Sequence, residues 1–172
     1  MALQSPTLIS SLNTNSGAVG SITFSSIPQT YTDLKIIMSI RATTGGGGVW
    51  LHSTYNGSNN AMNACWYSSG SAYGNANGYG STSNGYNALI TGAGDTGNTF
   101  AQVEWYIMNY TSSNPKTMFT DGYEENNAAI AYTTYGFVQW NTSSALTSIT
   151  FTADSGNIDQ YSTFYLYGIS NS

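Results

Sequence analysis

The stretch DLKIIMSIRA (residues 33–42) decides the class of fold, because its side chains alternate in character with a period of two. An extended strand sends successive side chains to opposite faces. Here one face carries apolar residues only: Leu34, Ile36, Met38, Ile40 and Ala42. The other face is mostly polar, so the stretch predicts a strand with one side in a core and the other toward water.

The same period recurs along the chain, whereas no segment keeps a 3.6-residue period over three turns. We expect further strands in the ranges 18–24, 49–55, 61–67, 86–91, 99–110, 116–121, 129–140, 145–151 and the last part of 157–170. In 145–151 the alternation places Phe151 on one face and Leu146 on the other. Roughly nine to eleven short strands joined by Gly, Asn and Ser turns predict an all-β protein with almost no helix, folded as an antiparallel, jelly-roll-like β-sandwich.

The composition favours one folded domain over residues 1–172. Charged residues make up only 6% of the chain, but 14% are aromatic, and disordered chains lack aromatic residues. The low-complexity stretch SSGSAYGNANGYGSTSNG (68–85) predicts a long flexible loop inside this domain. Flexible linkers seldom need large rings, so we expect Tyr73 and Tyr79 to contact a partner.

The charge balance argues against nucleic acid and membranes as partners. The net charge is −5, and the three basic residues, Lys35, Arg41 and Lys116, form no cluster in the sequence. No apolar run approaches the length of a membrane span. Residues 1–17 lack the features of a signal peptide, so we expect synthesis in the cytoplasm. Cys65 is the sole cysteine, which predicts a buried thiol and no intrachain disulfide.

Candidate catalytic and metal-binding groups are few. His52, the only histidine, is expected to be structural, because no G-x-S-x-G motif accompanies it. Glu104 is the best candidate for a perturbed acid, and the adjacent Glu124 and Glu125 should point to opposite faces of a strand. DSGNID (154–159) carries oxygen ligands that calcium accepts, but it does not match an EF-hand and is typical of a turn. We therefore expect no enzyme activity, no cofactor and no metal site.

Large apolar side chains occupy both faces of several expected strands. Phe164, Leu166 and Gly168 share one face of the last strand, and its other face carries Tyr165, Tyr167 and Ile169. A similar surplus appears at Phe100, Tyr106, Met108, Tyr110, Tyr132 and Tyr135. One sandwich core cannot hold both faces of a strand, and exposed rings forgo about 25 cal/mol per Å2 of buried apolar area. We expect these residues to contact another subunit; the alternative is that a long loop of the same chain covers them.

Three stretches carry a resemblance to a known family: SSIPQTYTDLKIIMSIRAT (25–43), NYTSSNPKTMFTDGYEEN (109–126) and NTSSALTSITFTADSGNIDQYSTFYLYGIS (141–170). They are similar to tailed-bacteriophage virion structural proteins, in which a strand opens with Y-T-D/H-L and the chain closes with Q-Y-S-x-F-x-L-Y-G-I. The resemblance implies a β-sandwich present in many copies on a virion surface. It carries no catalytic residues.

Within this family we expect a capsid decoration (cement) protein on the capsid exterior, made in the host bacterial cytoplasm. Such a protein, expected to be a homotrimer, would bind the major capsid protein in the assembled shell and stabilise the shell by mass action. One alternative is a tail- or fibre-associated adsorption module, favoured by loops rich in Tyr, Ser, Gly and Asn. Another is a carbohydrate-binding, lectin-like domain in which Trp50, Trp66 or Tyr79 stacks on a host-surface glycan.

Overall fold

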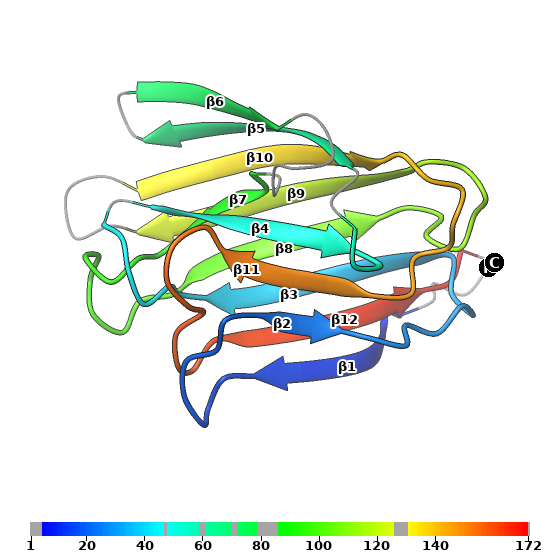
Figure 1. The fold of residues 1–172 in the computed structure, drawn as a ribbon, viewed down its shortest axis with the longest axis horizontal. Helices are drawn as coiled ribbons and strands as arrows, with labels where there is room; N and C mark the ends of the chain where they lie inside the picture. Colours follow the sequence, from blue (N-terminus) through cyan, green and yellow to red (C-terminus); the bar gives the residue numbers. More distant parts are fainter. Residues whose placement is uncertain are drawn as a thin grey trace.

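A computed structural model describes residues 5–46, 48–58, 61–69, 72–78, 86–125 and 131–171, and these ranges contain strands but no helix. The strands form two antiparallel sheets that pack against each other (Figure 1). The expectation of an all-β, antiparallel sandwich is therefore confirmed. Within the part of the chain that the structure describes, no helix is long and apolar enough to cross a membrane.

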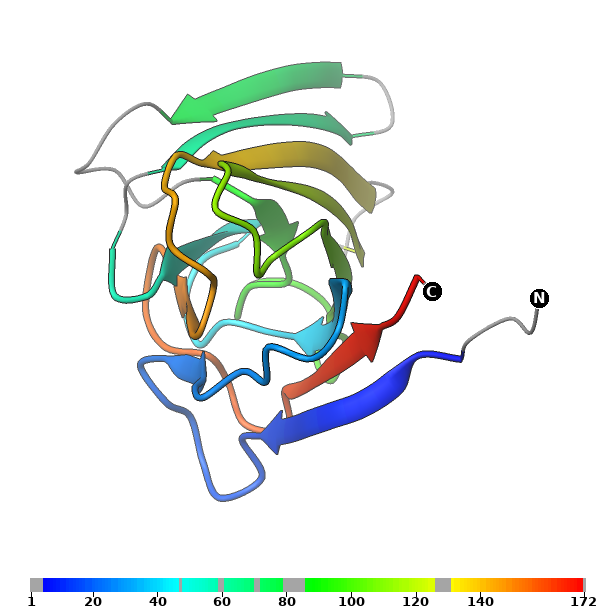
Figure 2. The ribbon, with the colours of Figure 1, turned by 90° about the vertical axis from the view of Figure 1, so that its right-hand side faces the viewer.

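The larger sheet has eight strands, which lie side by side in the order β1 (Thr7–Asn13), β12 (Thr163–Ile169), β3 (Asp33–Ile40), β8 (Ala101–Ile107), β9 (Lys116–Glu125), β10 (Ala131–Trp140), β5 (Ala61–Ser69) and β6 (Ala72–Gly78). The smaller sheet has four: β2 (Ile22–Phe24), β11 (Ile149–Ala153), β4 (Val49–Tyr55) and β7 (Ala88–Ile90). The chain crosses from the larger sheet to the smaller one before β2, β4, β7 and β11, and it returns to the larger sheet before β3, β5, β8 and β12. The larger sheet curves around the smaller one, and its β5–β6 edge extends past it (Figure 2).

The core lies between the two sheets and is formed by the apolar face of each strand. The residues that the 33–42 alternation places inward are all fully buried, which confirms that prediction. Aromatic rings join the sheets across the core. Trp105 meets Phe151 edge to face at 5.2 Å between centroids, and Phe151 stacks on Phe164 at 6.2 Å. Tyr55 packs on Trp105 and Trp140 at 6.3 and 5.8 Å between centroids. On β12, Phe164 and Leu166 point into the core as expected, whereas Tyr165 is exposed.

Two predictions about side-chain placement are wrong. Tyr110 does not contact a partner, because it is fully buried in the sandwich's own core, where its hydroxyl donates to the Pro28 carbonyl and accepts from the Tyr31 amide. Leu146 is also buried in the core. The strand β11 begins only at Ile149, so residue 146 lies in a loop that does not follow the alternation of a strand.

The predicted flexible loop over 68–85 is wrong for its first part, because β5 continues to Ser69 and residues 72–78 form the edge strand β6. β6 lacks an alternating apolar pattern, since it pairs with β5 through backbone hydrogen bonds and uses small residues. A Cβ atom at Gly74 would collide with the Tyr67 ring, so glycine lets this ring lie across the β5–β6 pair. Tyr79 and the side chain of Tyr73 lie outside the described residues, so contacts through them remain predictions.

Candidate interaction surface

Register places large side chains in rows across the outer face of the eight-stranded sheet. In one row, residues directly opposite each other on six neighbouring strands are Trp66, Tyr135, Asp121, Glu104, Ile37 and Tyr165. The next row consists of Ala64, Phe137, Phe119, Tyr106, Lys35 and Tyr167. Side chains directly opposite on one face have Cβ atoms about 5 Å apart, so each row is continuous.

Among the described side chains, five rings on this surface remain open to solvent, and we call them the outer aromatic face. They are between 37% and 54% exposed: Trp66, Phe119, Tyr123, Tyr135 and Tyr165. A ring of this size offers about 200 Å2, so the five leave about 500 Å2 of aromatic surface uncovered. Four of the rings lie on the neighbouring strands β5, β10 and β9, and Tyr165 lies apart from them on β12, beyond Asp121, Glu104 and Ile37. Exposed apolar patches of a few hundred Å2 are often functional sites.

Three of these rings have a ring partner that helps to hold them in place. Tyr123 and Tyr135 meet edge to face, with 3.1 Å between their hydroxyl oxygens. The Trp66 and Phe137 rings lie 6.0 Å apart across β5 and β10. Rings fixed in this way lose little conformational freedom when a partner covers them, which favours binding.

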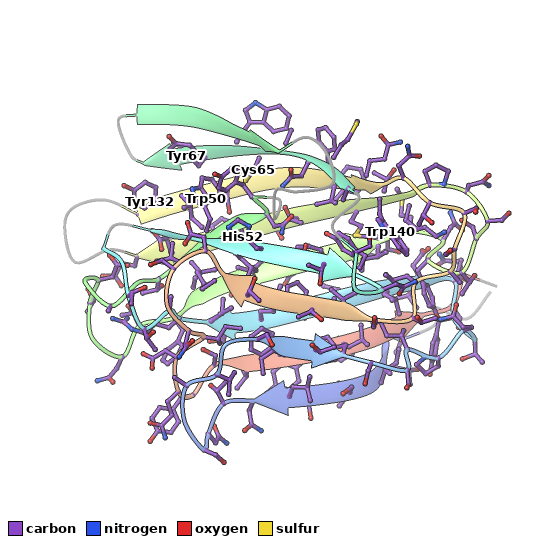
Figure 3. All side chains as sticks on the ribbon, in the orientation of Figure 1. Trp50, His52, Cys65, Tyr67, Tyr132 and Trp140 are labelled. Carbon is purple, nitrogen blue, oxygen red and sulfur yellow. The ribbon has the colours of Figure 1, made fainter. Side chains whose placement is uncertain are left out.

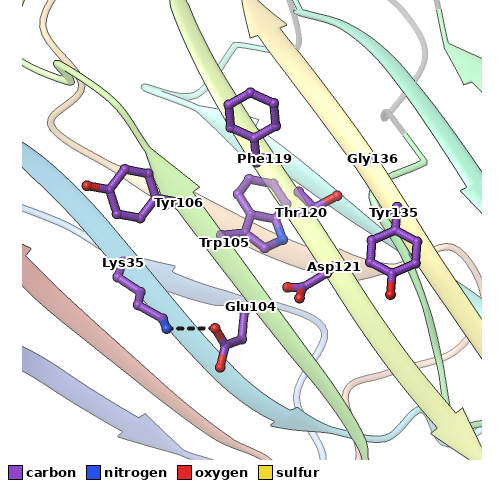
Figure 4. Close-up of a pocket in the computed structure, with 9 residues that line it drawn as sticks. All are labelled: Lys35, Glu104, Trp105, Tyr106, Phe119, Thr120, Asp121, Tyr135 and Gly136. Atoms are coloured by element: carbon purple, nitrogen blue, oxygen red, sulfur yellow. Dashed lines mark ion pairs between the residues drawn. The ribbon is translucent and has the colours of Figure 1, made fainter.

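A hollow of about 370 Å3 lies in the same surface, where β3, β8, β9 and β10 run side by side (Figure 4). The Lys35 ammonium and the Glu104 carboxylate form an ion pair of 2.7 Å at one side of it. The carboxylate of Asp121 lies between Glu104 and Tyr135 (Figure 4). The Phe119 and Tyr106 rings line the same hollow farther along the strands. Burial, and next the negative charge of Glu104, raise the pKa of the Asp121 carboxyl.

The residues predicted to contact another subunit differ in their exposure to solvent. Tyr135 and Tyr165 are exposed on the outer aromatic face. Five others are half-buried: Phe100, Tyr106, Met108, Tyr167 and Ile169. The Tyr106 hydroxyl donates to Asp33 at 2.8 Å. Tyr132 is half-buried too, but it lies opposite the buried Glu124 and thus on the inner side of β10.

Sequence reasoning missed Phe119 and Tyr123 as surface residues and named Trp66 only as a sugar platform. A usable signal was present in β9, because Phe119, Asp121 and Tyr123 alternate there with the inward Met118, Thr120 and Gly122. The predicted strand ended at residue 121, so this alternation was cut short. β9 in fact continues to Glu125.

His52 and the DSGNID turn, which were considered for catalysis and metal binding, lie among packing and ion-pair contacts of the fold. His52 is buried on β4 beside the Tyr86 ring, at 5.5 Å between centroids, and Trp50 packs on the rings of Tyr86 and Tyr67 (Figure 3). Asp159 of the DSGNID turn pairs with Arg41 at 3.7 Å. In the ranges that the structure describes, no three His, Cys, Asp or Glu side chains gather where they could hold a metal ion.

Arg41 and Lys116 are both buried and hold loops together. The Arg41 guanidinium donates to the carbonyls of Thr96 and Thr99 at 2.9 and 3.0 Å, and to two further carbonyls of the 92–99 loop. The Lys116 ammonium donates to three loop carbonyls at residues 112, 142 and 144, and lies 5.6 Å from the centre of the Trp140 ring. Neither cation is available to a partner.

Glu124 and Glu125 point to opposite faces of β9, as predicted. Glu125 is exposed, whereas Glu124 is buried, and neither of its carboxyl oxygens has a hydrogen-bond partner among the residues that the structure describes. Burial, and next the charge of Asp95, raise the pKa of Glu124 to about 8. This side chain is therefore mostly protonated near neutral pH.

The fold and the surface together define an all-β sandwich with an exposed aromatic sheet face around a charged hollow. Comparison of this chain with protein-family models, with curated proteins and with solved structures finds no match.

Proposed function

We propose that this chain is a bacteriophage virion structural protein that decorates the capsid exterior in many copies and docks on the shell through the outer aromatic face. The observation that carries the proposal is the set of five half-exposed rings on one sheet face. A partner that covers them would gain apolar burial.

The strand order supports this proposal. β1, β12, β3 and β8 form one set of four adjacent strands, and they face the second set, β2, β11, β4 and β7. The chain passes between the sets as in a jelly roll, with the hairpin strands β5–β6 and β9–β10 added at one side. We therefore propose a jelly-roll winding, an architecture that viral capsid domains and lectins use.

The proposal is also supported by the packing of the segments that resemble phage virion proteins. The Y-T-D-L step (31–34) and the closing L-Y-G-I (166–169) meet in space, because the Thr32 amide donates to the Ile169 carbonyl at 2.9 Å. A Cβ at Gly168 would overlap the Tyr31 ring, so the glycine of the closing motif makes room for the tyrosine of the opening one. The two motifs thus form one structural unit, as expected if the resemblance reflects a shared fold.

Shell binding by single variants tests the proposal. Tyr135→Ser removes a ring from the outer aromatic face, and Tyr161→Ser removes the more exposed ring of a loop outside that face. We expect Tyr135→Ser to weaken co-sedimentation with shells stripped of this chain by at least about tenfold, with an unchanged melting temperature. Tyr161→Ser should bind as the wild type does. Equal binding by both variants would contradict docking through this face.

The homotrimer is part of the same proposal, and analytical ultracentrifugation of the free protein tests it. The tail-associated alternative differs in copy number, since hundreds of copies per particle indicate a head protein and a few indicate a tail part. For the lectin alternative, Trp50 is already packed against two tyrosines, which leaves Trp66 as the described tryptophan exposed enough to stack on a sugar. Glycan-array binding that Trp66→Ser abolishes would favour that alternative.

A further inference from the structure

The hollow in the outer sheet face carries a surplus negative charge. Glu104 and Asp121 lie directly opposite each other on β8 and β9, and like charges in that position destabilise a sheet. Lys35 pairs with Glu104. Among the described residues, Asp121 forms no ion pair, so one carboxylate of the two has no cation.

The walls of the hollow suit a flat cation. The rings of Phe119, Tyr106 and Tyr135 line it together with the carboxylate of Asp121. A cation over an aromatic face is attracted by the ring quadrupole, most often as a guanidinium. A guanidinium is also planar and donates two parallel hydrogen bonds to one carboxylate, which an ammonium cannot do.

We infer that this hollow binds the guanidinium of an arginine that a different protein supplies, and this inference rests on the proposed docking of the outer aromatic face. A second copy of the chain cannot supply the group, because the sequence contains only three Lys and Arg residues. Lys35 already lies in the hollow, and Arg41 and Lys116 are buried under loop carbonyls. The outer aromatic face therefore meets a heterologous partner such as the shell, and contacts between copies lie elsewhere.

Titration with a small probe tests this inference without the shell. The probe is N-acetyl-arginine amide, followed by NMR of the isolated protein, and the matched control ligand is N-acetyl-citrulline amide, which has nearly the same shape without the charge. Asp121→Asn removes the surplus charge. Asp154→Asn is the control variant, since it makes the same charge change at an exposed loop residue away from the hollow.

We expect saturable shifts at Phe119, Tyr135 and their neighbours with a Kd in the millimolar range, about −4 kcal/mol. Asp121→Asn should weaken binding at least about fivefold, Asp154→Asn should leave it unchanged, and citrulline amide should not bind. The inference is overturned if no saturable shift occurs up to about 50 mM probe. It is equally overturned if citrulline amide or a neutral sugar binds as well as the arginine probe, or if Asp121→Asn has no effect.

The two proposals fail separately. Suppose that shells bind the wild type, that they do not bind the Tyr135→Ser variant, and that the arginine probe does not bind the isolated protein. In that case the inference fails and the proposed docking stands. If the arginine probe binds in the hollow but stripped shells do not bind the protein, the docking proposal fails.

Discussion

Replacing Glu124 by glutamine should stabilise the protein at alkaline pH. At acid pH the same substitution should have almost no effect on stability. The side chain is 4% exposed near the end of β9, and within the described part of the chain both carboxyl oxygens lack hydrogen-bond partners. An ionised carboxylate in this position has lost its water without gaining a compensating donor. Glutamine keeps the shape of the side chain and cannot ionise.

The sign and the size follow from linkage. Burial and Asp95 raise the pKa of Glu124 from 4.5 to about 8. Below pH 4.5 the group is protonated in both states, so it adds nothing to the pH dependence. Between pH 4.5 and pH 8 the unfolded chain releases a proton that the folded chain keeps, so wild-type stability falls by about 1.4 kcal/mol per pH unit. Over these 3.5 pH units the total is about 5 kcal/mol, or about 15 °C in Tm for a chain of this size.

The assay is thermal unfolding of the wild type, Glu124→Gln and Glu125→Gln at half-unit steps from pH 4.5 to pH 8.5. The melting temperature of Glu124→Gln relative to the wild type should rise steadily across this range. Glu125→Gln makes the same charge change at the exposed neighbour and should show a nearly flat difference. A constant difference between Glu124→Gln and the wild type would refute the assignment of a buried, protonated carboxyl.

Three further predictions concern packing and burial. Gly168→Ala places a methyl group against the Tyr31 ring and should lower the free energy of unfolding in denaturant by about 2 kcal/mol or more. Gly97 has open space around it, so Gly97→Ala should leave the free energy of unfolding unchanged. Equal effects of the two substitutions would contradict the packing of Gly168 on Tyr31. Arg41→Lys cannot reach the same set of loop carbonyls and should destabilise the protein by about 2–3 kcal/mol, and a change below about 0.5 kcal/mol would contradict that role. Burial raises the pKa of the Cys65 thiol to about 12, so Ellman's reagent at pH 8 should label native protein at least about 100-fold more slowly than unfolded protein. Fast native labelling would place this thiol at the surface.

The parts of the fold that the sequence predicts well are strands with one buried and one wet face. β3 and β12 alternate cleanly because the sheet-to-sheet core accepts one face only, and every residue placed inward there is buried. The edge strands were harder to find. β1 is mostly polar and β6 consists of Ala, Gly, Asn and Tyr, and both are held by pairing with a neighbouring strand rather than by a pattern of their own.

The surface was predictable as a surplus of rings, but its location was not. Tyr110 and Tyr165 look alike in the sequence, yet a loop folds Tyr110 into the core whereas a strand turns Tyr165 outward. The hollow was beyond sequence reasoning, because Glu104 and Asp121 become neighbours only through the register of β8 and β9. The raised pKa of Glu124 likewise depends on the fold, first through the burial of the side chain and next through the charge of Asp95 in a loop distant in the sequence.

The central claim is that the outer aromatic face is covered by another protein in the assembled particle. A cryo-EM map of the particle that carries this chain tests it most directly, at a resolution that places side chains. We expect the rings of Phe119, Tyr135 and Trp66 to lie against a neighbouring shell subunit, with that subunit's arginine beside Asp121. A map in which this sheet face points to solvent, and the chain is attached through its loops or strand edges, would contradict the claim.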